Sequence, residues 1–445
     1  MEKFITDEIQ NEAINDLSKL IAIPSFNEDA QEKAPFGKGP KKALDKAMEL
    51  AENLGFKTFE DPEGYYGYAD IGEGDQTFGI VGHLDEVPAG NLEAWDVEPY
   101  KLTIKDDILY GRGVQDDKGP SMAAMYAIKA ILDKGYKFNK KIRFIFGTDE
   151  EILWRCLAEY NKKEEPIDMG IAPDADFPLI YAEKGLQQSY LVGPGSKELN
   201  LDLENAFNAV PGKAIYNGPK QAEVLAALQK LDFDADKTAD GIEVHGKSVH
   251  AMEAPEGVNA VVRLGMALAE VFPDIKVLQF LKTFGEDANA TNLLGDVSDD
   301  VSGKLTFNIS SLKITPEESR MQIDMRIPVK IDHDKLIQQV SDAVAKFDMK
   351  YKNFDYVAPL YVPTDSELVK TLMKTYQDLT GDLKSQPAIS GGATFARTMH
   401  NCVAFGGMLP TTPNYMHQAN EQWSKADMKK AMEIFAEALY RLCVE

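Results

Sequence analysis

The chain has 445 residues, a length that predicts two or three hydrophobic cores and not one. Its composition, 44% hydrophobic and 27% charged, is typical of a soluble globular protein, and its net charge of -24 disfavours nucleic acid and anionic membranes as partners. The first 17 residues mix acids with apolar positions at helical spacing, which predicts an amphipathic helix and not a signal peptide. No run reaches the roughly 18 apolar residues of a membrane span. Three widely spaced cysteines indicate a reducing compartment, so we expect a cytoplasmic protein.

Helix and strand patterns alternate over the first 180 or so residues. Strands are predicted at 77–82 and 141–146, and helices at 40–54 and 120–133. Short apolar strands between helices of this length indicate an α/β domain with a mixed, mostly parallel sheet. Chemistry in such sheets gathers at the carboxyl ends of the strands.

The pattern changes near residue 183. Residues 183–387 hold helices at 219–231 and 257–272, and then the order strand 241–250, helix, strands 304–314 and 320–329, helix 333–347 and strand 353–362. That order suggests a ferredoxin-like sandwich. We therefore predict an α+β domain at 183–387 that is inserted into a catalytic domain formed by residues 1–182 and 388–445.

Five short segments place metal-type ligands after strand patterns or in glycine-rich loops. Each segment alone is ordinary, but acids gathered at one sheet edge would repel one another unless a cation joined them. Histidines together with carboxylates suit zinc, manganese or cobalt better than calcium. The segments are GHLDEVP with His83 and Asp85, YGRGVQDDKGP with Asp116 and Asp117, GTDEE with Glu150 and Glu151, APDADFP with Asp174 and Asp176, and NYMHQANEQ with His417.

In this order and spacing the motifs resemble the metallopeptidases grouped with aminoacylase, carboxypeptidase G, acetylornithine deacetylase and succinyl-diaminopimelate desuccinylase. Within that family the chain is most similar to the bacterial dipeptidase V type, the carnosinase-like Xaa-His dipeptidases. The resemblance rests on HLD, GRG-x-x-DDKG, DEE, PDADFP and MHQ-x-NE, and it covers essentially the whole chain. It implies a catalytic domain of zinc-exopeptidase type with an inserted lid.

The resemblance also implies roles for these residues. His83 and Asp174 would hold one metal ion, Glu151 and His417 the other, and Asp116 would bridge them. Glu150 would be the general base that acts on a metal-bridging water. Asp85 would hold the imidazole of His83 in its correct tautomer. The cofactor is then two divalent ions, with zinc preferred over manganese or cobalt.

Further site residues are expected in the lid and after it. His250 in GKSVHAMEAPEGVNA would donate to the oxyanion, and Arg326 in MQIDMRIP would pair with a substrate carboxylate. Asn208 in FNAVPGKA and the loop SGGATFAR, with Gly391 and Arg397, would line the substrate site. For Glu86, strand alternation favours an outward side chain, and Asp117 and Lys118 are expected to be a helix-start acid and a rim charge.

The implied function is hydrolysis of short unblocked peptides, chiefly dipeptides, by a monomer. Two alternatives stay open at this point. One is deacylation of N-acyl amino acids, and the other is a non-catalytic metal- or peptide-binding relative of such enzymes.

Overall fold

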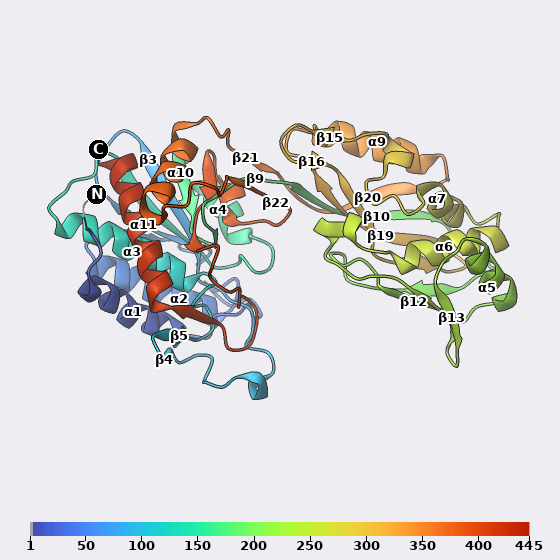
Figure 1. Cartoon of the computed structure of the whole chain (residues 1–445), viewed down its shortest axis with the longest axis horizontal. Helices are drawn as coiled ribbons and strands as arrows, with labels where there is room; N and C mark the ends of the chain where they lie inside the picture. The colour runs from blue at the N-terminus through green and yellow to red at the C-terminus, as the bar shows by residue number, and fades with distance from the viewer. Residues whose placement is uncertain (1–2, 445) are drawn as a thin grey trace. The chain divides into compact units, whose positions relative to one another are not determined.

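The computed structural model describes residues 3–444, and the chain forms two compact units. The first unit contains residues 1–181, 361–389 and 393–445, and the second contains residues 182–360 and 390–392. Figure 1 shows the course of the chain through both. Among the described residues, no helix combines the length and apolarity of a bilayer span.

A nine-stranded mixed sheet forms the centre of the first unit. Its four middle strands, in the order β6-β3-β7-β23, run parallel, and β1 and β2 continue it antiparallel. The predicted mixed sheet is therefore confirmed, and its parallel part is the four central strands. In order across the sheet the strands are β1 (Lys57–Glu60), β2 (Gly67–Ile71), β6 (Lys141–Gly147), β3 (Thr77–His83), β7 (Met169–Ala172), β23 (Cys402–Ala404), β9 (Ile180–Glu183) and β21 (Leu360–Tyr361), with β22 (Ala388–Ser390) paired to β9.

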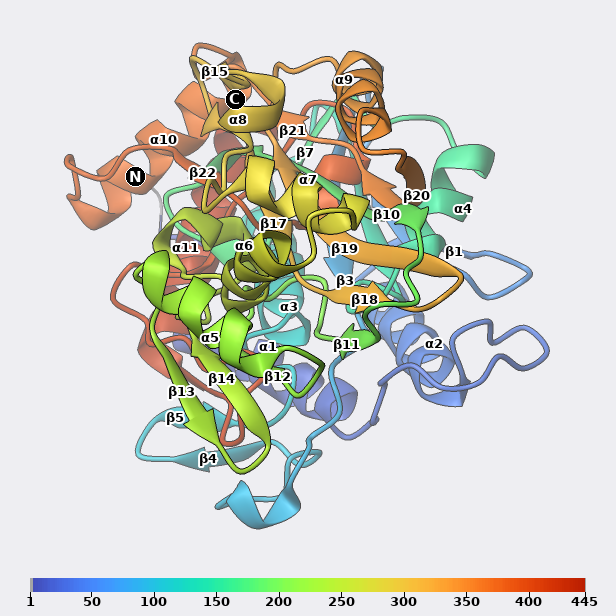
Figure 2. The same ribbon diagram turned by 90° about the vertical axis from the view of Figure 1, so that its right-hand side faces the viewer.

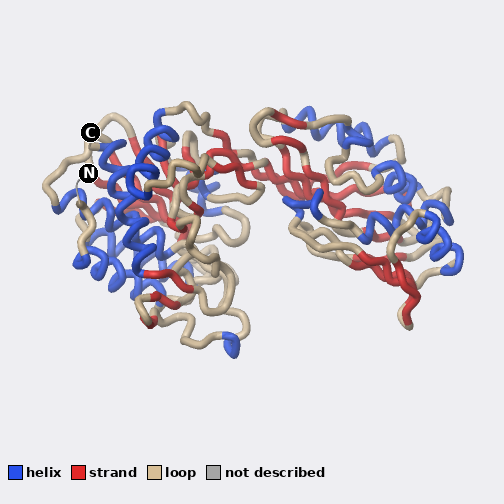
Figure 3. Tube along the Cα trace, viewed as in Figure 1, coloured by secondary structure: helices blue, strands red, loops and turns tan. Residues whose placement is uncertain are grey.

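Helices pack around this sheet, as the blue segments of Figure 3 show. Helix α3 contacts α1, α11 and strand β3, and α2 packs on β1 and β2. Helix α1 begins after Thr6, whose side chain accepts from the N–H of Ile9, and acids occupy its first turn as the helix dipole favours. The helices are α1 (Asp7–Ile21), α2 (Lys38–Asn53), α3 (Lys118–Asp133), α4 (Arg155–Lys163), α10 (Glu367–Thr380) and α11 (Lys425–Cys443).

Two small sheets hold late segments of the chain against early ones. Strand β25 (Gln422–Ser424) pairs with β5 (Ile108–Tyr110), which pairs with β4 (Thr103–Lys105). Strand β24 (Gly407–Met408) runs parallel to β8 (Ala175–Asp176). Single 3-10 turns lie at η1 (Leu92–Ala94) and η3 (Phe395–Thr398).

The strand β3 ends against the start of α3, and Gly82 makes that approach possible. A Cβ atom at Gly82 would lie 2.1 Å from Ser121 Oγ and 2.8 Å from Asp117 Oδ2. With glycine there, Asp117 Oδ2 accepts from the N–H of His83 at 3.1 Å and from Ser121 Oγ at 2.8 Å. The missing side chain thus lets helix α3 fix the backbone of His83.

The second unit is built on an antiparallel sheet with helices α6, α7 and α9 packed on it, as Figure 2 shows. Its central order β20-β10-β19, with β17 and β18 beyond β19, is that of a ferredoxin-like sandwich, so this prediction is confirmed. The strands are β10 (Gly185–Pro194), β11 (Leu201–Leu203), β17 (Thr306–Ile309), β18 (Leu312–Ile314), β19 (Glu318–Ile327) and β20 (Lys350–Val357), and the helices are α5 (Gln221–Lys230), α6 (Ala260–Val271), α7 (Lys276–Phe284), α8 (Thr291–Leu294) and α9 (His333–Ala345).

The first strand of the sandwich is not the predicted one. The expected strand at 241–250 became β14 (Gly241–His245), which lies in a separate three-stranded sheet between β12 (Lys213–Tyr216) and β13 (Ala235–Thr238). The sandwich begins instead with β10, which pairs along its length with β19. Sequence order alone cannot show which of two strand patterns enters a sheet. The remaining short elements are η2 (Ala251–Glu256), β15 (Ser298–Asp299) and β16 (Gly303–Lys304).

The predicted end of the inserted domain at residue 387 is also wrong. The chain returns to the first unit at Tyr361, and residues 390–392 belong to the second unit. The amide of Val362 donates to the carbonyl of Tyr181 at 2.9 Å, and α10 packs against α11. The apolar face of α10 is thus buried in the first unit, a tertiary choice that its amphipathic pattern did not reveal.

We predict that Gly82→Ala lowers the stability of the first unit by ~1–3 kcal/mol, because the added methyl group must displace Ser121 and Asp117. Urea unfolding followed by tryptophan fluorescence measures this, since Trp95, Trp154 and Trp423 all lie in the first unit. The control is Glu165→Ala, at an exposed position of the same unit, where no packing contact is disturbed and no change is expected. Equal transitions for Gly82→Ala and the unaltered chain would contradict the packing described.

Candidate metal centre

Three neighbouring parallel strands end at the same edge of the sheet, and each delivers a predicted ligand there. His83 is the last residue of β3, Glu151 follows β6, and Asp174 follows β7. Asp116 lies in the loop before α3, and His417 lies in the loop before β25. The carboxyl edge of a parallel sheet is where such α/β domains place their sites.

The five predicted ligands form two groups that share Asp116. The groups are His83 with Asp116 and Asp174, and Asp116 with Glu151 and His417, and within each the ligand atoms lie within 4.8 Å of one another.

The two oxygens of Asp116 face opposite histidines. Asp116 Oδ1 lies 3.0 Å from His83 Nε2, and Asp116 Oδ2 lies 2.9 Å from His417 Nε2. Each histidine also approaches the other acid of its group: His83 Nε2 is 3.6 Å from Asp174 Oδ2, and His417 Nε2 is 3.1 Å from Glu151 Oε1. This is the arrangement that a carboxylate bridging two cations requires.

The acids and histidines around Asp116 have shifted pKa values. Hydrogen bonds with Asp116 and Glu151 raise the pKa of His417 to about 10. Burial works against a charged His83, yet its hydrogen bonds with Asp116 and Asp174 raise its pKa well above the ordinary value. Burial raises the pKa of Asp174 and Glu151 above that of an ordinary carboxyl, and the Asp116 carboxylate adds to the rise. The acids thus draw positive charge onto the imidazoles, and divalent cations would supply that charge with the imidazoles neutral.

The donor set of each group fits such a cation. One imidazole nitrogen and two carboxylates, of which Asp116 counts in both groups, are ligands that zinc, manganese and cobalt accept. The residues present therefore suit a pair of divalent ions.

Asp85 supports the site through both its backbone and its carboxylate. The Nδ1 atom of His83 lies 3.0 Å from the backbone carbonyl of Asp85, and 3.6 Å from its Oδ1. The carboxylate accepts from the N–H groups of Glu150 and Glu151, each at 3.0 Å, and from Asn27 Nδ2 at 3.3 Å. Asp85 thus orients His83 through its backbone and fixes the Glu150–Glu151 loop through its side chain.

The Glu150 carboxylate belongs to neither group of ligands. Burial raises its pKa well above the ordinary value, and the nearby Asp174, Glu151 and Asp116 carboxylates add to this, while His83 opposes it. Within residues 3–444 no hydrogen bond or ion pair occupies the Glu150 carboxylate, so it is available to a reacting molecule.

Comparison with known proteins identifies the family. The model of peptidase family M20/M25/M40 matches residues 79–441, which is most of the chain. The chain belongs to this family.

Relatives of this M20 peptidase support the assignment. A Bacillus subtilis protein named "Putative dipeptidase YtjP" is 33% identical over an alignment of 459 positions, which covers 97% of this chain and 97% of that protein. Among solved structures, aminoacylhistidine dipeptidase from Vibrio alginolyticus is similar with a TM-score of 0.61 at 12% identity, over 100% of this chain and 99% of that one. Human carnosine dipeptidase 1 is similar with a TM-score of 0.58 at 17% identity, over 97% and 96%. These two structures share the fold.

Glu86 and Lys118 of the peptidase contradict the predictions made for them. Both were expected at the surface, but both are buried and form an ion pair of 2.5 Å. Glu86 Oε1 accepts from the N–H of Ser25 at 2.9 Å, and Lys118 donates to the carbonyl of Ile23 at 3.0 Å. The pair ties the segment after α1 to the loops of Asp85 and Asp116. Residue 86 lies beyond the end of β3, so strand alternation no longer applied.

In the second unit, the structure fixes the tautomer of His250. The N–H of Met252 donates to His250 Nδ1 at 3.2 Å, which leaves the ring proton on Nε2. Burial, followed by the nearby Arg326 guanidinium, lowers the pKa of His250. The imidazole is therefore neutral, and its Nε2–H has no hydrogen-bond acceptor among residues 3–444.

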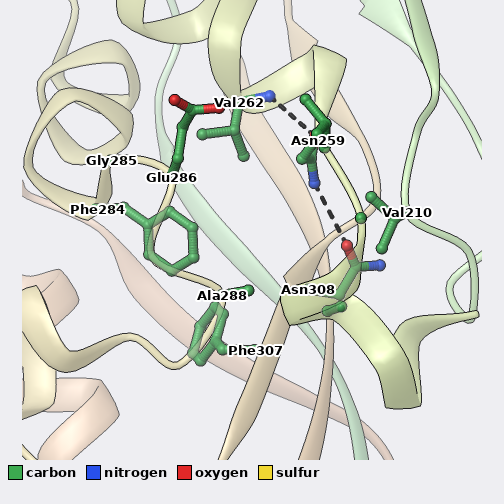
Figure 4. A pocket seen from close by; sticks show the side chains of 12 residues that line it. Val210, Asn259, Val262, Phe284, Gly285, Glu286, Ala288, Phe307 and Asn308 are labelled. Atoms are coloured by element: carbon green, nitrogen blue, oxygen red, sulfur yellow. Dashed lines mark hydrogen bonds between the residues drawn. The ribbon is translucent and has the colours of Figure 1, made fainter. Parts of the chain in front are cut away.

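Asn208 lies beside His250 because two short segments pair. The amide of Ala251 donates to the carbonyl of Asn208 at 2.8 Å, and Ala209 bridges to His250. The buried Asn308 donates to the carbonyls on both sides of Asn208, those of Phe207 at 3.3 Å and of Ala209 at 2.9 Å. Asn308 itself accepts from Asn259, the N-cap of α6, as the dashed line in Figure 4 shows. The backbone that carries Asn208 is thus anchored to the sandwich.

Arg326 is buried and already partly paired. Its Nε donates to Asp324 Oδ1 at 2.8 Å, and its Nη1 donates to the carbonyl of Gly391 at 2.8 Å. Because a guanidinium has five N–H donors, some are left for a ligand carboxylate. A Cβ at Gly391 would lie 2.9 Å from Met252 Cβ, so the close approach of this loop to η2 requires glycine.

Arg397 lies in the first unit, apart from the unit that contains Gly391. It is buried in η3, and its guanidinium lies 5.8 Å from the centre of the Trp154 ring. Gly391 and Arg397, which were both expected to line the substrate site, therefore belong to different units.

Sequence reasoning missed Arg112 and Glu421. Both are buried, and Arg112 Nη1 lies 2.7 Å from Glu421 Oε2. Both stand inside motifs that were recognised, GRG-x-x-DD and MHQ-x-NE, but only the ligands of those motifs had been given a role. Their position was the available signal, because a charged residue that stands inside a ligand motif without being a ligand is a candidate for a supporting role.

Proposed function

We propose that this chain is a metal-dependent dipeptidase that hydrolyses the amide bond of short unblocked peptides. The observation that carries the proposal is the shared Asp116 carboxylate, whose two oxygens face two separate ligand groups. Relatives that match nearly the whole chain at 33% identity carry the name "Putative dipeptidase", which supports the choice of substrate.

We assign two divalent ions to the site, one with His83 and Asp174, one with Glu151 and His417, and both with Asp116. Zinc is our first choice, with manganese and cobalt as alternatives, because one nitrogen and several carboxylates around each ion suit all three. When bound, such ions lower the pKa of water and polarise a carbonyl group.

Glu150 is the proposed general base. Its carboxylate is near both ligand groups without belonging to either, and its backbone is held by Asp85. It would take the proton of the attacking water and return it to the leaving amine. The neighbouring Glu151 then differs in role only because its carboxylate faces His417.

Substrate recognition is assigned to residues of the second unit. His250 offers a neutral Nε2–H for the oxyanion, and Arg326 offers unspent guanidinium donors for the carboxyl terminus. Asn208, held next to His250, would contribute a further polar contact.

We predict hydrolysis of Leu-Gly and Ala-His with kcat/KM at least ~100-fold above that for N-acetyl-leucine, because acids beside the ions would pair with the free amino group of a dipeptide, which N-acetyl-leucine lacks. The assay uses apoprotein prepared by chelation and reloaded with zinc, manganese or cobalt singly. Turnover is expected to vanish on chelation and to return on reloading. Preferred cleavage of N-acetyl-leucine would replace the proposal with an amino acid deacylase.

We predict that Glu150→Gln lowers kcat by roughly 10²–10⁴-fold while both ions stay bound, since the amide cannot accept the proton. Steady-state kinetics on Leu-Gly and metal analysis of the same sample measure the two properties. Glu165→Gln, at an exposed position of the same unit, is the control and should behave like the unaltered chain. A Glu150→Gln protein with ordinary kcat would refute the assignment of the base.

A further inference from the structure

The loop that carries Asp116 is joined to the loop that carries His417 by a strand pair. Strand β25 pairs with β5, so that Gln422 lies opposite Tyr110. The ladder continues one step further, because the N–H of Gly111 donates to the carbonyl of Glu421 at 3.0 Å. The side chain of Glu421 thereby enters the loop 111–116.

Inside that loop, the fully buried Glu421 carboxylate accepts four hydrogen bonds. Oε1 accepts from the N–H groups of Gln115 at 2.8 Å and Asp116 at 3.2 Å. Oε2 accepts from the N–H of Gly113 at 3.1 Å and from Arg112 Nη1 at 2.7 Å. Such donors satisfy a buried carboxylate and fix the backbone immediately before the Asp116 side chain.

The same loop also holds the segment around His417 at three further points. Gln115 donates through Nε2 to the carbonyl of Pro413 at 2.9 Å, and its Oε1 accepts from the N–H of Tyr415 at 2.8 Å. Arg112 Nη1 donates to the carbonyl of Gln418 at 3.3 Å.

These contacts surround a residue with an unusual backbone. His417 has φ 63°, in the left-handed region that is unfavourable for a non-glycine residue and persists only where surrounding contacts impose it. Hydrogen bonds at positions 413, 415, 418 and 421 supply that constraint from both sides of His417.

We propose that Glu421, together with Arg112, is a positioning residue that sets the spacing between Asp116 and His417 and thereby the affinity for the second metal ion. The proposal rests on the two-metal function proposed above. Glu421 touches neither ligand group; it acts through the backbone of Asp116 and through the segment that ends after His417.

The substitution Glu421→Gln tests the proposal with little change in size. Each carboxylate oxygen of Glu421 accepts two hydrogen bonds. An amide NH₂ in place of either oxygen cannot accept, so two of the four hydrogen bonds are lost and donor faces donor. We expect one of the two metal-binding steps to weaken by ~10–100-fold, the loss that removal of supporting hydrogen bonds typically causes. Binding of the other ion, which is assigned to His83, Asp174 and Asp116, should change less.

Calorimetric titration of the apoprotein with Mn²⁺ measures both steps, and electron paramagnetic resonance of the loaded protein reports whether the ions are coupled through a bridge. The unaltered chain should bind two coupled ions, and Glu421→Gln should show an isolated ion at the same loading. The matched control is Asp70→Asn, which breaks another ion pair of the first unit, that of the half-buried Asp70 with the buried Arg143 at 2.7 Å. This control should lower the melting temperature and leave the coupled spectrum intact.

If Glu421→Gln fails to fold, Gln115→Ala removes the contacts to Pro413 and Tyr415 without unpairing a buried charge, and should weaken the same binding step. Two coupled ions bound with ordinary affinity in the folded variant would overturn the proposal. The proposal would also be overturned if Glu421→Gln and Asp70→Asn weakened metal binding equally. If the unaltered chain itself binds no coupled pair, the two-metal function fails first, and the role of Glu421 fails with it.

Discussion

The shared carboxylate of Asp116 is the interaction on which the rest of the site depends. Its two oxygens lie 3.0 Å from His83 Nε2 and 2.9 Å from His417 Nε2, although those histidines are 334 positions apart in the chain. Holding one carboxylate between two imidazoles requires that the sheet edge, the loop before α3 and the loop before β25 be fixed together. Much of the polar network in the first unit serves that requirement.

Three buried acids near the site support it without ligating. Asp85 fixes the backbone of Glu150 and Glu151, Glu86 pairs with Lys118, and Glu421 holds the loop of Asp116. Each is satisfied by backbone N–H groups, a basic side chain or both, which is what allows a charged group to remain buried. The site therefore has a layer of supporting carboxylates that the ligand motifs alone do not reveal.

The sequence was sufficient to predict the mixed sheet and the sandwich, and to place the candidate ligands at one edge of the sheet. His83, Glu151 and Asp174 follow apolar strands, and strand ends converge by the rules of parallel sheets. The same reasoning failed for Glu86 and Lys118, because their burial depends on each other and on Ser25 and Ile23, which are distant in sequence. It also failed for the domain boundary at 387, because α10 could have packed on either unit.

In the second unit, patterns located His250 and Arg326 but not what they contact. The tautomer of His250 follows from the N–H of Met252, and the pairing of Arg326 with Asp324 follows from their places on β19. Such local partners are set by backbone geometry and not by residue type.

The central claim is that Asp116 bridges two metal ions. Crystals of the manganese-loaded protein, with diffraction data collected at the manganese absorption edge, test it most directly. The account predicts two anomalous peaks about 3.5–4 Å apart, one on each side of the Asp116 carboxylate. A single peak, or two peaks of which one does not contact Asp116, would contradict it.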